Sequence, residues 1–273
     1  PTDLCESYRK ELEKRKKTEP LRYGFPSLDY ITGGIRRQEL TTVSARPGIG
    51  KTAFAWQVAV SLALRKHRVQ FYPLEMAGFQ LMERLVCRET NLKGEKLKAP
   101  AKMDEKDTEM LNYFFELYGM TIRDYLDVVE GVRTLAEIRR HIEHYRPELV
   151  VIDQLTQLRE NRRFNSIREQ FSYMTNTLKA MTMDLDVPIM LLAQINRNGD
   201  SKEPTLGDLK ESGSIEEDSD NVIMLHQTDE QIGPITPVTM IVRKQRNGAK
   251  DVRIECVYQN EKYVFREKPI SSR

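Results

Sequence analysis

The sequence has few of the features that mark secreted or membrane proteins. Its three cysteines, Cys5, Cys87 and Cys256, lie far apart and form no Cys-x-x-Cys pair. That odd, scattered set argues against a disulfide framework or a zinc site and favours a reducing compartment. The longest apolar run, at residues 187–193, falls far short of the roughly 20 residues that a membrane-spanning helix needs. Because the N-terminus is polar and charged, we expect no signal peptide, no membrane contact and a cytoplasmic location.

The chain also lacks an excess of charge of either sign. Its 43 basic and 41 acidic residues leave a net charge of +2, so any basic surface for nucleic acid must be local. Hydrophobic residues make up 39% and charged residues 31% of the chain, a balance typical of soluble globular domains. Its 273 residues suffice for one large domain with a short arm. Because it begins with Pro1 and not with Met, we expect a piece of a longer protein.

We expect residues 1–20 to form a linker helix or arm and residues 21–273 to form one domain. Residues 6–17, ESYRKELEKRKK, place Glu three and four residues from Lys, which supports a charged helix. Tyr8 and Leu12 give it only a narrow apolar stripe. The helix is therefore either a solvated linker or an arm that docks these two side chains onto a neighbouring subunit.

Apolar and β-branched segments alternate with amphipathic ones after Pro20. The patterns predict helices at 51–66, 79–90, 135–146 and 166–184, and strands at 39–45, 68–76, 148–153, 188–194 and 221–227. Residues 91–130 are predicted to be helical with one short strand. Alternating strands and helices indicate a mostly parallel twisted sheet flanked by helices. Residues 238–259 predict a C-terminal β-hairpin joined at Asn247-Gly248.

A phosphate-binding loop is predicted between the first strand and the helix that follows it. The stretch ARPGIGKT at 45–52 matches G-x-x-x-x-G-K-[ST] except for its first position, which is Ala45. Gly48 and Gly50 let the backbone N–H groups face an anion, which the N-terminus of the next helix also attracts. Lys51 is placed to reach the β- and γ-phosphates of ATP, and Thr52 to bind Mg²⁺. The expected nucleotide contacts are Arg46, Pro47, Gly48, Ile49, Gly50, Lys51, Thr52 and Ala53.

Three polar side chains close other predicted strands at the sheet edge where ligands bind in open α/β sheets. Asp153 ends LVVID, where a carboxylate can hold Mg²⁺; alone, it would be interpreted as a cap or turn residue. Glu75 lies at the end of the second strand and is a candidate base for an attacking water, or else a surface carboxylate. Gln194 is a candidate sensor of the γ-phosphate, or else an ordinary edge amide.

Taken in order, these segments resemble the motifs of DnaB-type replicative DNA helicases, in their RecA-like P-loop ATPase domain. The matching stretches are GFPSLDYITGGIRRQEL, ARPGIGKTAFA, FYPLEM, LVVIDQLTQL, LLAQINR, LKESGSIEEDSDNVIML and VRKQRNG, which span about residues 22 to 266. The resemblance implies a homohexameric ring that binds ATP and Mg²⁺ between neighbouring subunits. It implies 5′→3′ movement along single-stranded DNA and unwinding of the duplex, in a bacterial cytoplasm or, for a phage protein, the host's.

The resemblance also assigns roles to single residues. Glu75 matches the catalytic glutamate, Asp153 the Walker B aspartate and Gln194 the phosphate-sensing glutamine. Arg246 matches the arginine finger that reaches the nucleotide of the adjacent subunit, and Lys244 a lysine that accompanies it. Without the family, positions 244 and 246 would be interpreted as an ordinary basic strand face, since residues two apart share one face of a strand.

Two segments are candidates for contact with DNA. Lys210, Glu211 and Gly213 match family positions that touch the sugar-phosphate backbone, although an arginine is commoner at the first, and lysine lacks its fork geometry. The second segment, RENRRFNSIR at 159–168, offers Arg159, Arg162 and Arg163 for an electrostatic groove. It is equally compatible with a solvated loop.

Two other functions share parts of this pattern. A RecA-like recombination or repair ATPase would form filaments, and a nucleotide-gated assembly factor would bind partners without unwinding. The resemblance to helicases further implies partners such as primase and a helicase loader, met through an N-terminal domain that this sequence lacks.

Overall fold

The computed structural model describes residues 3–17, 19–195, 202–209, 212–227 and 233–269. Within them a nine-stranded sheet runs in the order β3-β2-β4-β5-β1-β6-β7-β8-β9. The strands from β3 to β6 in this order are parallel, and β7 to β9 are antiparallel. The parallel strands are β1 (Leu40–Ala45), β2 (Val69–Pro73), β3 (Leu126–Val128), β4 (Leu149–Asp153), β5 (Ile189–Gln194) and β6 (Asn221–His226), and the antiparallel ones are β7 (Ile235–Gln245), β8 (Val252–Gln259) and β9 (Val264–Glu267).

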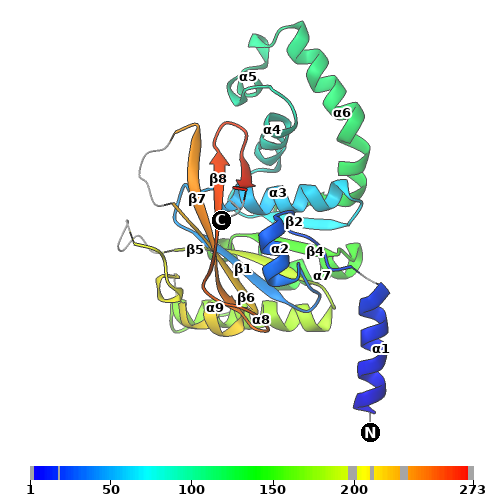
Figure 1. Cartoon of the computed structure of the whole chain (residues 1–273), viewed down its shortest axis with the longest axis vertical. Coiled ribbons are helices and arrows are strands. Elements are labelled where there is room, and N and C mark those ends of the chain that lie inside the picture. Colours follow the sequence, from blue (N-terminus) through cyan, green and yellow to red (C-terminus); the bar gives the residue numbers. More distant parts are fainter. Residues whose placement is uncertain (1–2, 18, 196–201, 210–211, 228–232, 270–273) are drawn as a thin grey trace.

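Helices cover both faces of this sheet (Figure 1), which explains why its central strands are buried along their whole length. On one face α3 (Lys51–Leu64) lies with α2 (Pro26–Thr32), α4 (Gly78–Glu89) and α6 (Glu105–Tyr125) over one apolar core. On the other face α7 (Leu135–Tyr145) and α8 (Ile167–Asp184) pack over a second core. The remaining short helices are α5 (Gly94–Lys98), α9 (Ser212–Asp218) and the 3-10 turns Pro100–Lys102, Leu155–Gln157 and Leu206–Asp208.

Helix α1 (Leu4–Lys17) stands apart from the rest of the molecule (Figure 1). Three apolar side chains on it, Leu4, Tyr8 and Leu12, are exposed and spaced four residues apart, so they share one face. Of the helices in the described part of the chain, none is both long and apolar enough to cross a membrane.

The mostly parallel RecA-like architecture and its antiparallel C-terminal hairpin confirm the predicted fold class. Three elements were not predicted, namely α2, α9 and β9. The two helices have seven residues each, too few for a clear helical period, although α2 has Pro26 at its start and Gly33 in the left-handed conformation at its end.

The hairpin differs from the sequence prediction in its connection. Pairing between β7 and β8 stops at Val242 and Val252. Strand β7 continues beyond that point because Lys244 and Gln245 still pair with β6. Neither Asn247 nor Gly248 has the positive φ that a tight two-residue turn needs. The connection is therefore a longer loop at the edge of the sheet.

Candidate nucleotide-binding site

The carboxyl ends of four neighbouring strands bring the candidate residues to one edge of the sheet. Asp153 ends β4 and pairs with Pro73 at the end of β2, while Gln194 ends β5 and pairs with Ala45 at the end of β1. Glu75 lies two residues beyond β2, and its backbone N–H donates to the Asp153 carbonyl over 3.2 Å. The phosphate loop follows β1 directly.

The phosphate loop has the backbone that its glycines predict. Gly48 and Gly50 have φ of +86° and +97°, a region that residues with a side chain rarely adopt. Gly50 also caps the N-terminus of α3, and its carbonyl accepts from the Phe54 N–H at 2.9 Å. Free N–H groups at the start of a long buried helix suit a phosphate anion.

An aromatic pair lies under this loop. Tyr258 on β8 and Phe265 on β9 stack with 4.4 Å between ring centroids. A Cβ atom at Gly50 would lie 3.0 Å from the Phe265 ring and 3.1 Å from the Tyr258 ring. Glycine at position 50 is therefore required both by its backbone angle and by the close approach of the rings.

Lys51 points into the polar edge. Its ammonium group donates to the Oε1 atom of Gln154, the residue that follows Asp153. Burial lowers the pKa of Lys51, and the negative charges of Asp153 and Glu75 act in the opposite direction. The Lys51 ammonium group thus lies close to both carboxylates, at the place where a bound phosphate group could contact it.

Asp153 has the properties of a metal ligand. It is 1% exposed, and neither carboxylate oxygen makes a hydrogen bond of good geometry to any described residue. Burial raises the pKa of Asp153, while the charges of Lys51 and Arg84 and the nearby Thr52 hydroxyl lower it. Two buried oxygens without hydrogen bonds beside a hydroxyl fit Mg²⁺, which prefers oxygen ligands.

Glu75 and Gln194 flank this carboxylate with different exposure. Glu75 is exposed and Gln194 is half-buried. An exposed carboxylate close to a buried ammonium group is accessible to water. A neutral amide at the end of the neighbouring strand can donate to an anion without adding charge.

Sequence reasoning missed Arg84 on α4. Burial raises the pKa of the Asp153 carboxyl and of the Tyr258 phenol, and the positive charge of Arg84 partly offsets both shifts. Its guanidinium carbon lies 5.0 Å from the centre of the Tyr263 ring, a cation–π arrangement. Gln154, Tyr258 and Phe265 were missed as well. Only the adjacency of Gln154 to Asp153 was a usable signal, because the other three reach the site through tertiary packing.

Arg246 and Lys244 lie at the opposite edge of the sheet, beside the amino ends of strands β1 and β6. Gln245 pairs with Asn221 at the start of β6, which in turn pairs with Thr41 near the start of β1. The phosphate loop begins at the other end of β1, about 15 Å away at roughly 3.3 Å per residue. Arg246 is 66% exposed and its Nη1 lies 3.2 Å from Asp220. It therefore does not face the phosphate loop of its own chain.

The two DNA-contact candidates lie next to each other. Lys210 and Glu211 are outside the described residues, but Gly213 lies in α9, and the guanidinium of Arg168 comes within 3.1 Å of its Cβ position. Arg168 belongs to the basic segment 159–168 at the start of α8. The basic segment thus meets the Gly213 segment at Arg168.

Within the basic segment, Arg162 is held by two aromatic rings. Its guanidinium carbon lies 4.9 Å from the Phe164 ring centre and 4.6 Å from that of Tyr173. Arg159 forms an isolated bridge with Thr134. Arg163, like Arg159 and Arg162, is exposed, and no residue in the described part of the chain forms an ion pair with it. Among the described residues, Arg163 and Arg159 are therefore the candidates without a charge partner, since the bridge of Arg159 to Thr134 involves the backbone only.

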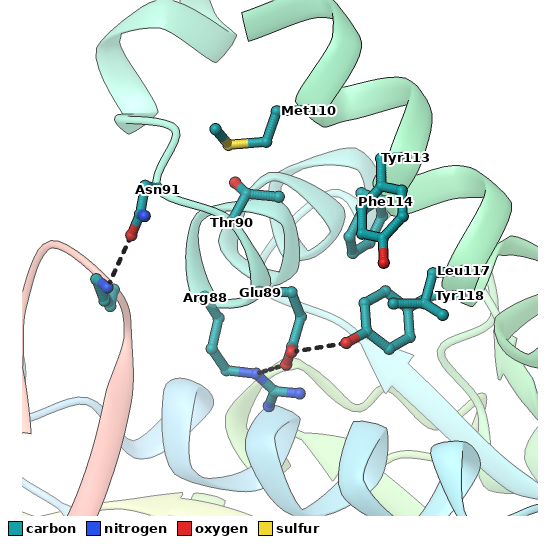
Figure 2. Close-up of a pocket in the computed structure, with 10 residues that line it drawn as sticks. Arg88, Glu89, Thr90, Asn91, Met110, Tyr113, Phe114, Leu117 and Tyr118 are labelled. Carbon is teal, nitrogen blue, oxygen red and sulfur yellow. Dashed lines mark hydrogen bonds and ion pairs between the residues drawn. The ribbon is translucent and has the colours of Figure 1, made fainter. Parts of the chain in front are cut away.

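A separate hollow of about 340 Å³ lies between α4 and α6. Figure 2 shows Tyr113, Phe114 and Tyr118 of α6 on one side, with Arg88 and Glu89 of α4 below. Glu89 accepts from Arg88 at 2.7 Å and from the Tyr118 hydroxyl at 3.4 Å. None of the lining residues belongs to the phosphate site. This hollow is distinct from the nucleotide-binding edge.

The sheet order, the phosphate loop after β1 and the carboxylate at the end of β4 define a RecA-like P-loop NTPase. The match extends to a particular family. The chain belongs to the family described as the DnaB-like helicase C terminal domain, whose model matches residues 21–267.

Similar proteins agree with this assignment. The chain is 32% identical over 258 residues to the "Replicative DNA helicase DnaC" of Bacillus subtilis (strain 168), covering 90% of this chain and 56% of that protein. It also resembles a solved ATPase domain with a TM-score of 0.82 and 25% identity, covering 95% of each chain.

A second solved structure shares the fold. It is described as "The Structure Of A DnaB-Like Replicative Helicase And Its Interactions With Primase", with a TM-score of 0.79 and 24% identity, covering 97% of this chain and 67% of that one. The chain spans about half the length of the curated relatives it matches.

Proposed function

We propose that this chain is the ATP-driven motor domain of a replicative DNA helicase. In this proposal it hydrolyses ATP with Mg²⁺ and assembles as a homohexameric ring. The ring moves 5′→3′ along single-stranded DNA in the cytoplasm of a bacterium or of a phage host, and separates the duplex at the replication fork. The observation that carries the proposal is the division of the catalytic groups between two opposite edges of one sheet.

At the first edge, residues 46–53 would surround the triphosphate of ATP. Backbone N–H groups around Gly48 and Gly50 would bind the phosphates, and Lys51 would move from Gln154 to their oxygens. Thr52 and Asp153 would hold Mg²⁺, which neutralises charge on the phosphate oxygens.

Two further side chains at this edge would act on the γ-phosphate. Glu75, exposed near Asp153, would orient the attacking water and accept its proton. Gln194, at the end of β5, would hydrogen-bond to the γ-phosphate and change its contacts once that phosphate leaves.

At the second edge, Arg246 and Lys244 would serve the site of a neighbouring subunit. Arg246 cannot reach its own phosphate loop along the length of β1, and most of its side chain is exposed. In a ring, that edge would face the phosphate loop of the next subunit. A guanidinium supplied in this way stabilises charge in phosphoryl transfer and couples the two subunits.

Helix α1 supports the same assembly. We propose that residues 1–20 form an arm outside the ATPase domain of residues 21–273. Its exposed Leu4, Tyr8 and Leu12 would pack on a neighbouring subunit, because such an apolar face on an isolated charged helix gains stability only by burial.

For DNA we propose the surface formed by Gly213 and the basic segment, with Lys210 and Glu211 beside it. Arg159, Arg162, Arg163 and Arg168 would contact phosphates, which positions the strand without reading its sequence. Primase and a loader are proposed partners of a longer form of the protein; one structural neighbour is described with its interactions with primase.

Unwinding of a forked DNA duplex tests this function. The 273-residue chain should separate a fork with a 5′ single-stranded tail in the presence of ATP and Mg²⁺, and Lys51→Ala should not. ATP hydrolysis without strand separation, together with open filaments in electron micrographs, would favour a recombination ATPase. Nucleotide-dependent assembly without turnover would favour an assembly factor.

A further inference from the structure

Asp220 lies where α9 meets β6, and its carboxylate binds three groups at once. Oδ2 accepts from the Leu40 backbone N–H at 2.8 Å and from the Lys179 ammonium group at 2.6 Å. Oδ1 accepts from Nη1 of Arg246 at 3.2 Å. The backbone of Asp220 is fixed as well, since its N–H donates to Leu40 and its carbonyl accepts from Arg246. The carboxylate therefore has one defined position.

The Asp220 carboxylate contacts Arg246 through one guanidinium nitrogen only. Asp220 is 5% exposed, whereas Arg246 is 66% exposed. A guanidinium group has five N–H donors, and Asp220 engages one nitrogen of the group. The remaining donors are free to meet an anion. Lys179 supplies a second cation to the same carboxylate, so Arg246 can leave without stranding a buried charge.

Lys244, two residues before Arg246, also contacts the end of α9 that leads into β6. Its ammonium group donates to the carbonyl oxygens of Glu216 and Glu217 in the last turn of α9. The other side of α9 is fixed to α8, because the Thr175 hydroxyl donates to Asp218 at 2.5 Å. The first turn of α9 contains Gly213, which lies against Arg168. One short helix thus connects the DNA-contact surface with both basic residues.

We propose that Asp220 is a positioning residue for Arg246, and that α9 transmits movement of the Gly213 segment to it. The inference rests on the proposed function, because it requires Arg246 to act on nucleotide held by a neighbouring subunit. Asp220 would hold the guanidinium outward, ready for the neighbour's γ-phosphate. A shift of α9 on DNA binding would move Asp220 and Lys244 together. It would thereby change the rate of ATP hydrolysis at the site of the neighbouring subunit.

Asp220→Asn tests the positioning role by separating kcat from KM. Misplacement of a catalytic group by about 1 Å can cost on the order of a hundredfold in rate, so we expect kcat for ATP to fall at least tenfold. The KM for ATP should not change, because the variant's own phosphate site lies at the opposite edge. Asp184→Asn is the matched control: it removes a carboxylate that pairs with Arg139 on the surface, and kcat should remain unchanged. A normal kcat in the Asp220 variant would overturn the proposal.

Mixed rings separate this inference from the proposed function. Lys51→Ala subunits have a dead site but an intact Asp220–Arg246 pair, so mixing them with Asp220→Asn subunits should restore ATP hydrolysis above the sum of the two. Lys51→Ala mixed with Arg246→Ala should do the same. Recovery only with Arg246→Ala would refute the role of Asp220. Failure of both mixtures would refute the shared site itself, and the inference with it.

Two further variants cover loss of folding and the role of α9. If Asp220→Asn does not fold, Asp220→Glu retains the charge beside Lys179 and moves it by one methylene; we expect the same drop in kcat with unchanged KM, and a normal kcat would overturn the proposal. Thr175→Val removes the hydrogen bond that joins α8 to Asp218 of α9. It should reduce the stimulation of ATPase by single-stranded DNA several-fold, and an unchanged stimulation would exclude α9 as the connection.

Discussion

The two glycines of the phosphate loop give a matched pair of substitutions. Gly48 and Gly50 both have strongly positive φ, but only Gly50 has packed atoms at its Cβ position, while nothing lies within 4 Å of that position at Gly48. A left-handed conformation costs a residue with a side chain about 1–2 kcal/mol. Crowding against a packed core adds about 1–3 kcal/mol. We therefore expect Gly48→Ala to lose about 1–2 kcal/mol of stability and Gly50→Ala about 2–5 kcal/mol.

Urea unfolding of the nucleotide-free protein measures this difference directly. The midpoint should fall for both variants, and further for Gly50→Ala, with equal m-values that show an unchanged extent of unfolding. Nucleotide binding should follow the same order, because a displaced Tyr258–Phe265 pair changes the start of α3, where Lys51 lies. Equal midpoints for the two variants, or full ATP affinity in Gly50→Ala, would refute the role given to the aromatic pair.

Three other predictions concern charge. Lys51→Ala should retain its fold by circular dichroism but lose ATP hydrolysis; substantial remaining turnover would remove the phosphate-loop assignment. Affinity for single-stranded DNA should fall steeply with salt, and Arg163→Ala should reduce the slope of log K against log salt by about 0.7, whereas an exposed arginine elsewhere, changed in Arg123→Ala, should leave it unchanged. A hydrogen bond from Arg253, with help from Arg243, lowers the pKa of Glu203 from 4.5 to about 2. Because this folded-state pKa is depressed, its contribution is present above pH 4.5 and is lost as the pH falls toward 2; the difference in unfolding midpoint between wild type and Glu203→Gln should therefore shrink over that range.

The parallel sheet and the phosphate edge were predictable because they depend on local pattern and on a simple rule of topology. Strands such as LVVID are apolar up to their last residue, and their carboxyl ends meet at one edge, so Asp153, Gln194 and the phosphate loop come together as expected. The placement of Arg246 at the opposite end of the strands depends on β7 pairing antiparallel with β6. The predicted hairpin specified only the antiparallel pairing of β7 with β8.

Other parts of the site could not be read from local sequence. Arg84 and Tyr258 act at the phosphate edge only because α4 and β8 pack over it, and nothing in their own neighbourhood marks them. Asp220 is one of five acidic residues between 211 and 220, and nothing in the local sequence distinguishes it from the others. Its burial beside Lys179 and Arg246 joins three segments distant in the sequence. Such contacts follow from tertiary packing alone.

ATP hydrolysis per subunit, measured across the concentration range of assembly, tests the shared site most directly. Oligomer mass should be determined on the same samples, with assembled Arg246→Ala protein as the control. A site completed by the neighbouring subunit predicts that turnover per subunit rises with the assembled fraction and stays low in that control. Equal turnover per subunit in isolated monomers and in rings would contradict it.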